Sequence, residues 1–355
     1  MGKYLIDSVL ATDIANAIRE KTGETGTIVA DNFPSAIEAI KGGFPNGTEW
    51  TQSNITSGSF ECIVNANGLW VACGDYYGLY YSTDGKTWTQ SNITSGNFTL
   101  IFFANGVFVA CGASTGVYYS TDGKTWTASN ATSGGFKCIV NANGLWVAGG
   151  NVNKKGFYYS TDGKTWTASN NTSANVNSLS FANGIFVASD SSGIYYSTDG
   201  KTWTASNVTS GGPYCIVNAN GIWVAGSQKT YSYKGFYYST DGKTWTASNV
   251  TNKCIDCVYN ANGIWVAGVK STGLYYSTDG KTWTQSNITS GGFECIVNAN
   301  GIFVAGGTGL YYSADGKTWT QSNVTDKTIY KIINDNGMWV VGSEGFYYSV
   351  AWEAA

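Results

Sequence analysis

The chain has 355 residues, of which 43% are hydrophobic and 12% are charged, and its formal net charge at pH 7 is −3. This many apolar and aromatic residues favour a globular fold over a disordered chain. The small charge and the lack of a basic cluster argue against nucleic-acid binding, and no apolar run approaches the roughly 18 residues that a membrane span needs.

Two residue types on which many enzymes depend are missing or nearly so. The chain contains no histidine, and its single arginine is Arg19. Ser-His and Cys-His nucleophile pairs and imidazole metal ligands are therefore excluded. We expect no catalytic residue, no metal site and no cofactor.

Residues 1–45 differ from the rest of the chain and favour helices. In "ATDIANAIREKTG" Asp13 suits an N-cap and Gly23 a helix end, and in "DNFPSAIEAIKGG" Pro34 suits a first helical turn. Two short helices bury little apolar surface alone. We expect this segment to attach to a partner chain or to copies of itself.

From Trp50 onward the sequence repeats, with tryptophans 36 to 42 residues apart. Each repeat contains an Asn-Gly pair between β-rich runs, which is the strongest short signal for a hairpin. Seven repeats also carry Asp-Gly-Lys-Thr-Trp. We predict four strands per repeat, A to D, with tight A–B and C–D turns.

A unit of roughly 40 residues with four short strands is typical of a β-propeller blade. A parallel β-helix ranks second. The chain enters with a lone D-like strand at Trp50 and leaves after a C strand at 345–349, so the first strand can complete the last blade. The sequence predicts an all-β, eight-bladed propeller over residues 46–355; seven blades with an irregular remainder is the alternative.

The repeated aspartate could be a catalytic acid, a metal ligand or a turn former. A catalytic carboxylate needs an environment unlike its neighbours', which seven equivalent copies cannot each have. An Asp before Gly hydrogen-bonds its own turn. We assign structural roles to Asp84, Trp88, Asp122, Trp126, Asp162, Trp166, Asp199, Trp203, Asp241, Trp245, Asp279, Trp283, Asp315 and Trp319.

The stretch "YSTDGKTWT" resembles the Asp-box, or BNR repeat, of sialidases and of many secreted or phage-borne propellers, although it is one residue shorter between Asp and Trp. The resemblance implies that Ser82 and Asp84 bind backbone groups of the C–D turn and that Trp88 packs between strands. Sialidase activity is not expected, because those enzymes use an arginine triad and this propeller region has no arginine.

The segments "DIANAIREKTG" and "TIVADNFPSAIEAI" resemble the start of tail-associated proteins in phages and prophages of Gram-positive bacteria. This resemblance implies a module that residues 1–45 tie to other phage tail proteins, with the propeller as adhesin. The N-terminus has no signal-peptide pattern, which fits assembly in the bacterial cytoplasm before incorporation into the virion.

Sequence variation among the repeats is concentrated in the B–C loops and, less strongly, in the D–A segments, whereas the A–B and C–D turns are nearly constant. Strand alternation puts both variable sets on one rim, and loops on a rigid scaffold often carry binding. Exposed aromatic faces there suit sugars, or else cover neighbouring blades. The candidate ligand-binding residues are Tyr76, Tyr77, Lys154, Lys155, Lys229, Tyr231, Tyr233 and Lys234.

These features predict a non-enzymatic, tail-associated receptor-binding protein that recognises a bacterial cell-surface glycan or protein. A glycan hydrolase on the same rim is an alternative, since a glycosidase needs only two carboxylates. No acidic position recurs in a telling arrangement, because Glu61 and Glu294 share a position that is Lys137 in another repeat. A structural tail or baseplate component is the third hypothesis.

Two further recurring residue types are assigned to structure. Cysteines at equivalent positions of different repeats, such as Cys62 and Cys138, are expected to be buried small hydrophobes and not disulfides. Cys254 and Cys257 form a lone C-x-x-C, which is weak evidence for a metal site.

The Asn-x-Thr runs, of which the first begins at Asn54, match glycosylation sites. We interpret their Asn and Thr side chains as forming local turn hydrogen bonds instead.

Overall fold

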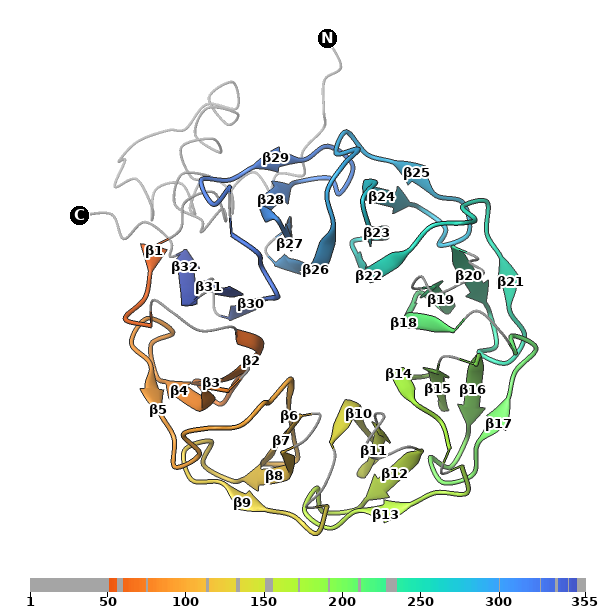
Figure 1. The fold of residues 1–355 in the computed structure, drawn as a ribbon. Coiled ribbons are helices and arrows are strands. Elements are labelled where there is room, and N and C mark those ends of the chain that lie inside the picture. The colour runs from red at the N-terminus through yellow and green to blue at the C-terminus, as the bar shows by residue number, and fades with distance from the viewer. Residues whose placement is uncertain are drawn as a thin grey trace, which may run out of the picture.

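The computed structural model describes residues 51–349, except for 56–59, 75, 113–114, 132–134, 151–155, 172, 191, 210–211, 228–234, 300, 326, 336–337 and 344. Its strands form eight separate four-stranded sheets, arranged as blades around a central opening (Figure 1). The eight-bladed prediction is confirmed and the seven-bladed alternative is wrong. The helices expected in residues 1–45 lie outside the described residues.

Every sheet has the same antiparallel order, from the A strand at the centre to the D strand at the periphery (Figure 1). The A strands are β2 (Phe60–Ala66), β6 (Leu100–Ala104), β10 (Phe136–Ala142), β14 (Val176–Ala182), β18 (Pro213–Ala219), β22 (Ile255–Ala261), β26 (Phe293–Ala299) and β30 (Lys331–Asp335). The B strands are β3 (Leu69–Gly74), β7 (Val107–Gly112), β11 (Leu145–Gly150), β15 (Ile185–Asp190), β19 (Ile222–Ser227), β23 (Ile264–Val269), β27 (Ile302–Gly307) and β31 (Met338–Ser343). The C strands are β4 (Gly78–Ser82), β8 (Gly116–Ser120), β12 (Phe157–Ser160), β16 (Ile194–Ser197), β20 (Phe236–Ser239), β24 (Gly273–Ser277), β28 (Gly309–Ser313) and β32 (Gly345–Ser349). The D strands are β1 (Thr51–Gln52), β5 (Thr89–Gln90), β9 (Thr127–Ala128), β13 (Thr167–Ala168), β17 (Thr204–Ala205), β21 (Thr246–Ala247), β25 (Thr284–Gln285) and β29 (Thr320–Gln321).

The first and last strands close the ring, as predicted from the lone D-like strand at the start of the repeats. Thr51 of β1 pairs with Tyr348 of β32, and Ser53 N donates to Phe346 O at 3.0 Å. The two strands lie side by side at the outer edge of the last blade (Figure 1). This pairing covers an edge that would otherwise be open to another chain.

The two constant turns form because their residues accept unusual backbone angles or supply local acceptors. In the first A–B turn Asn67 and Gly68 have φ values of 54° and 76°, as a two-residue type I′ hairpin requires. In the C–D turn Asp84 Oδ1 accepts from Lys86 N at 2.8 Å and from Thr87 N at 2.7 Å. Ser82 Oγ accepts from Gly85 N at 2.9 Å. The turn role expected for the aspartate and serine is therefore present.

The repeated tryptophans build the contacts between blades. Trp88 is 3% exposed and stacks on Phe346 of the preceding blade, with ring centroids 4.3 Å apart. The same stacking joins Trp203 to Phe157 at 3.9 Å and Trp283 to Phe236 at 4.1 Å. Burying large aromatic faces between sheets is a main source of stabilisation in such a ring.

An asparagine just beyond the D strand joins neighbouring blades, which corrects the interpretation of local bonding. Asn92 Oδ1 accepts from Trp126 N at 2.8 Å, and Asn92 Nδ2 donates to Trp126 O at 3.0 Å, across 34 residues of sequence. The local bond is made by the preceding serine instead, since Ile93 N donates to Ser91 Oγ at 3.0 Å. The same two-bond clamp is made by Asn54, Asn130, Asn207, Asn249 and Asn287.

Candidate functional site at the mouth of the central opening

A β-bulge marks the start of the A strand in six blades. In β2 the register slips between Phe60, which pairs with Gly74, and Cys62, which pairs with Cys73, so that Glu61 is the extra residue of the bulge. A bulge re-aims the extra side chain. The bulged residues are Glu61, Lys137, Asn177, Tyr214, Asp256 and Glu294, and Thr99 and Tyr330 hold the equivalent positions in the two remaining blades. We call these eight residues the mouth ring.

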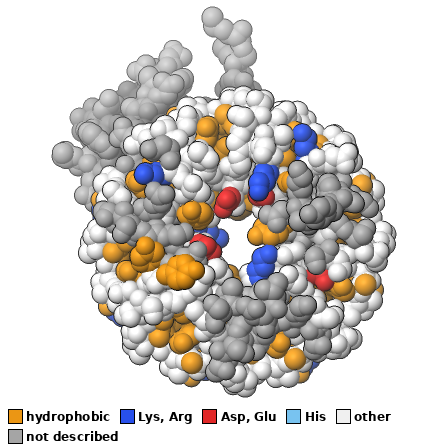
Figure 2. Space-filling view, in the orientation of Figure 1, with side chains coloured by type: hydrophobic (Ala, Val, Ile, Leu, Met, Phe, Trp, Pro, Cys, Tyr) orange, Lys and Arg blue, Asp and Glu red, His pale blue; other side chains and the backbone are white. Residues whose placement is uncertain are grey.

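The mouth ring is the variable position of an otherwise repeated strand. The strands β2, β10 and β26 read FECIVNA, FKCIVNA and FECIVNA, so only the second residue differs. That residue lies at the end of the A strand next to the B–C and D–A loops, on the variable rim. Acidic and basic side chains gather around the central opening there (Figure 2). The comparison of repeats in the sequence gave this position no role because no acidic residue recurs there. The feature that marks the position is the variation of its residue type from blade to blade.

One side of the mouth ring is already engaged in internal contacts. Lys137 Nζ donates to Asn177 Oδ1 at 2.8 Å and lies over the Tyr214 ring, 4.4 Å from its centroid. Burial lowers the pKa of Lys137, because it disfavours the ammonium form. One cation thus links three neighbouring blades along one side of the opening.

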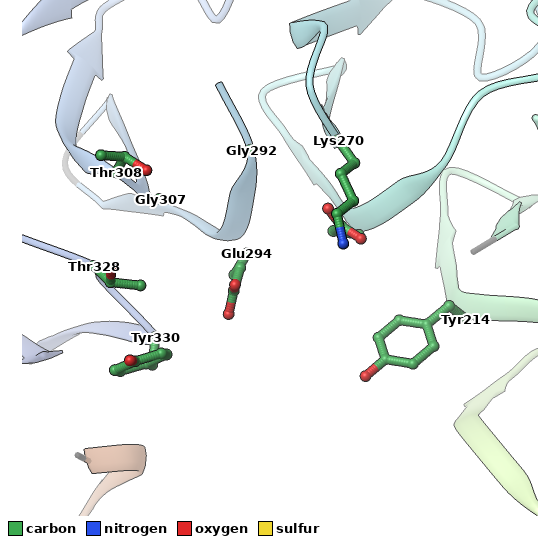
Figure 3. Close-up of a pocket in the computed structure, with 9 residues that line it drawn as sticks. Tyr214, Lys270, Gly292, Glu294, Gly307, Thr308, Thr328 and Tyr330 are labelled. Carbon is green, nitrogen blue, oxygen red and sulfur yellow. The ribbon is translucent and has the colours of Figure 1, made fainter. Parts of the chain in front are cut away.

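The other side of the ring borders a cavity of about 360 Å³, which we call the mouth cavity (Figure 3). Its lining combines mouth-ring side chains with residues of the B–C loops and D–A segments. An isolated β-bridge between Thr308 and Thr328 holds two of these segments together. The lining residues are Tyr214, Asp256, Lys270, Gly292, Glu294, Gly307, Thr308, Thr328 and Tyr330.

The surroundings of the mouth cavity raise the pKa of one carboxyl and one phenol in its lining. Partial burial and then the charge of Asp256 raise the pKa of Glu294, while Lys270 lowers it. Burial also raises the pKa of Tyr214, followed by the charges of Asp256 and Glu294. In both groups burial is the largest cause of the shift, and the neighbouring carboxylates add to it.

Tyr76 and Tyr77, predicted as ligand-binding residues, lie in the first B–C loop and are 77% and 41% exposed. Within the part of the chain that the structure describes, they are the exposed large hydrophobic residues. The Tyr77 ring lies 6.2 Å from the Phe60 ring, so Tyr77 is anchored on the core and Tyr76 projects beyond it.

The backbone of this loop has a counterpart in the sixth blade. Tyr76 has a φ of 64° and Ser271, at the equivalent position, has a φ of 63°. Gln90 Nε2 donates to Tyr77 O at 3.0 Å, and Gln285 Nε2 donates to Thr272 O at 2.7 Å. The same loop therefore forms with Ser-Thr in place of Tyr-Tyr, and the fold does not require the tyrosines.

The other predicted ligand-binding residues cannot be placed. Lys154, Lys155, Lys229, Tyr231, Tyr233 and Lys234 lie outside the described residues.

The cysteines are free thiols. Cys62 and Cys73 pair across one hairpin, and Ile101 N of the next blade donates to Cys62 Sγ at 3.2 Å.

Among the residues with described positions, no group of three or more metal-ligating side chains occurs, and no helix is long and apolar enough to cross a membrane.

No family model matches the chain, and no curated protein matches it. Among solved structures, it is similar to the computationally designed Ika8 protein, with a TM-score of 0.67 and 11% identity over 86% of this chain and 100% of that chain. It is similar to Sqt1 of Saccharomyces cerevisiae, with a TM-score of 0.66 and 10% identity over 85% of this chain and 97% of that chain. A structure of YCF48 bound to D1 peptide has a TM-score of 0.53 and 16% identity over 86% of this chain and 95% of that chain. At these identities the comparisons show the fold alone.

Proposed function

We propose that this chain is a non-enzymatic, phage tail-associated receptor-binding protein whose variable rim recognises a bacterial cell-surface glycan or protein. The observation that carries the proposal is the confinement of repeat-to-repeat variation to one rim. The mouth ring and the B–C loops differ between blades there, whereas the opposite rim repeats the same Asn-Gly and Asp-Gly turns. The association with a tail rests on the resemblance of residues 1–45.

Tyr76 supports a binding role because the fold gains nothing from a bulky residue at that position. A non-glycine residue in the left-handed region costs about 1–3 kcal/mol, least for small polar residues and more for bulky ones. Ser271 adopts the same conformation in the matching loop. A tyrosine that is strained and mostly exposed is well explained by contact with a ligand outside the chain, since tyrosine presents an apolar face and a polar tip.

The proposed ligand is a glycan or a protein. Aromatic rings beside hydroxyl and charged groups suit sugar faces. YCF48, whose fold is similar, was solved bound to D1 peptide, which keeps a peptide or protein ligand within the proposal.

The test uses cell binding by the full chain and by one loop exchange. We expect the labelled protein to bind cells of at least one strain in a panel of Gram-positive bacteria, measured by flow cytometry. Replacing Tyr76→Ser and Tyr77→Thr together installs the residues of the sixth-blade loop, and we expect binding to fall about tenfold or more.

The control is Thr121→Ala, at an exposed position of a C–D turn on the constant rim, which should bind as the unchanged protein does. The proposal fails if no strain is bound, or if Thr121→Ala reduces binding as much as the loop exchange.

A glycan hydrolase on the same rim is the second candidate, and one observation favours it. Asp256 and Glu294 line the same cavity, and burial raises the pKa of Glu294, as a general acid requires. Release of reducing ends from cell-wall polysaccharide by the full chain, abolished by Glu294→Gln, would establish the hydrolase in place of the binding protein.

A further inference from the structure

Four consecutive blades place an ordered set of side chains along one arc of the mouth ring. In chain order these are Tyr214, Asp256, Glu294 and Tyr330, so that an acidic pair is flanked by an aromatic ring on each side. Figure 3 shows the flanking rings of Tyr214 and Tyr330 on opposite sides of Glu294, at the edge of the opening. All four side chains line the mouth cavity.

The charges that line this cavity do not balance. Among the described residues of the lining, Asp256 and Glu294 contribute two carboxylates and Lys270 one ammonium. Lys137, the mouth-ring cation, is engaged with Asn177 at 2.8 Å and with the Tyr214 ring at 4.4 Å. A positively charged ligand group would supply the missing charge and relieve the repulsion between the two carboxylates.

The aromatic members of the arc suit the same kind of group. An ammonium within about 6 Å of a tyrosine centroid is attracted by the ring face. Tyr214 already holds one ammonium in this way, that of Lys137, on one of its faces. Two half-buried tyrosines thus lie on either side of the acidic pair in the lining of the cavity, which also includes Thr308 and Thr328.

We infer that the mouth cavity binds the free primary ammonium group of an amino sugar in a surface glycan, at the acidic pair Asp256 and Glu294 that Tyr214 and Tyr330 flank. This inference rests on the proposed function and narrows its ligand class. Lys270 is the described cation of the lining whose charge acts on Glu294. A ligand ammonium competes with it for the carboxylates.

The probes are chitosan and chitin oligomers of equal length, which differ in whether the amine is free or acetylated. Isothermal titration calorimetry with the full chain should show binding of chitosan, and at least about tenfold weaker binding of chitin. Glu294→Gln keeps the shape of the side chain and removes its charge, so it should weaken chitosan binding about tenfold or more.

The chain supplies a matched control at the same strand position. Glu61 is the bulged residue of the first blade and is not among the residues that line the cavity. Glu61→Gln should therefore change chitosan binding by less than about twofold, as expected for a charge outside the contact. Lys270→Thr removes the competing ammonium and should tighten chitosan binding, whereas it would weaken binding if Lys270 held the ligand.

Three results would overturn the inference: equal binding of both oligomers, equal losses in Glu61→Gln and Glu294→Gln, or tighter binding of oligolysine than of chitosan. Equal losses in the two variants would indicate unspecific attraction of a cation to the carboxylates of the mouth ring. Tighter binding of oligolysine would indicate that the ligand carrying the ammonium group is a peptide. If cell binding is lost in the Tyr76 and Tyr77 exchange but kept in Glu294→Gln, the proposed function stands and this inference fails.

Discussion

At the scale of single residues, the repeated aspartate acts as an anionic acceptor for its own turn. Asp122 Oδ1 accepts from Thr125 N at 2.7 Å, and Ser120 Oγ donates to it at 2.9 Å. Partial burial raises the pKa of Asp122, but the hydrogen bonds outweigh it and lower the pKa overall. The pKa of Asp199 is lowered to about 2.

These shifts predict how stability depends on pH. A carboxyl whose pKa is lower in the folded chain stabilises the fold above its unfolded pKa of about 3.9, and this stabilisation is lost as pH falls toward the folded value. The urea midpoint should therefore stay nearly constant between about pH 7 and 5 and fall steeply below about pH 4. Asp122→Asn should lower the midpoint at neutral pH and reduce its fall in acid. A midpoint that rises on acidification would contradict this account of the turn.

A second residue-scale prediction concerns the asparagine clamp. Asn92→Ala removes both bonds to Trp126 and leaves buried backbone groups without partners, so it should cost about 2 kcal/mol in the free energy of unfolding. Asn92→Asp keeps an acceptor for Trp126 N and should cost less. Urea unfolding of the full chain measures both values, and an unchanged stability in Asn92→Ala would show that the clamp contributes nothing.

Whether the partners of these residues could be predicted from the sequence depended on how close the partners lie along the chain. The hydrogen bonds of the aspartate could be anticipated from the sequence because Asp, Gly and the backbone that it binds lie within one turn. Cys62 and Cys73 could have been paired by counting back from the Asn67-Gly68 turn, because a two-residue hairpin fixes its register. The partner of Asn92 could not, because it lies 34 residues away on a neighbouring blade.

At the scale of elements, closure of the ring depends on one short strand. The strand β1 pairs with β32 through Thr51 and Gln52, and Ser53 and Ile55 add backbone bonds to Phe346. Asn54 in the same segment clamps Trp88 of the first blade. The sequence predicted this closure because an extra D-like strand at the start matched a missing one at the end. The bulges of the A strands were not predicted, since the residue type at that position differs between blades.

The closure makes two otherwise equivalent substitutions differ in effect. Asn54→Ala and Asn92→Ala remove the same pair of bonds, but only Asn54 belongs to the segment that joins the two ends of the ring. Hydrogen exchange should therefore accelerate at residues 51–55 and 345–349 in Asn54→Ala and not in Asn92→Ala. Equal exchange in both variants would mean that β1 does not hold the ring closed.

At the scale of the whole molecule, a repeated scaffold carries one variable face. The Asn clamps, the stacked tryptophans and the constant turns recur from blade to blade, so the ring is rigid for reasons that do not involve a ligand. The mouth cavity and the Tyr76 loop lie on the rim that these interactions leave free to vary. The sequence predicted this rim and Tyr76 from variable loops, and it missed the cavity because the cavity is assembled from four different blades.

The most direct test of this account is hydrogen exchange of the full chain with and without the surface glycan of a strain that it binds. We expect slower exchange at residues 74–78, 269–273 and 292–294, on the variable rim, and unchanged exchange at the Asn-Gly and Asp-Gly turns. Slower exchange confined to those constant turns would contradict the account, because it would place the ligand on the opposite rim.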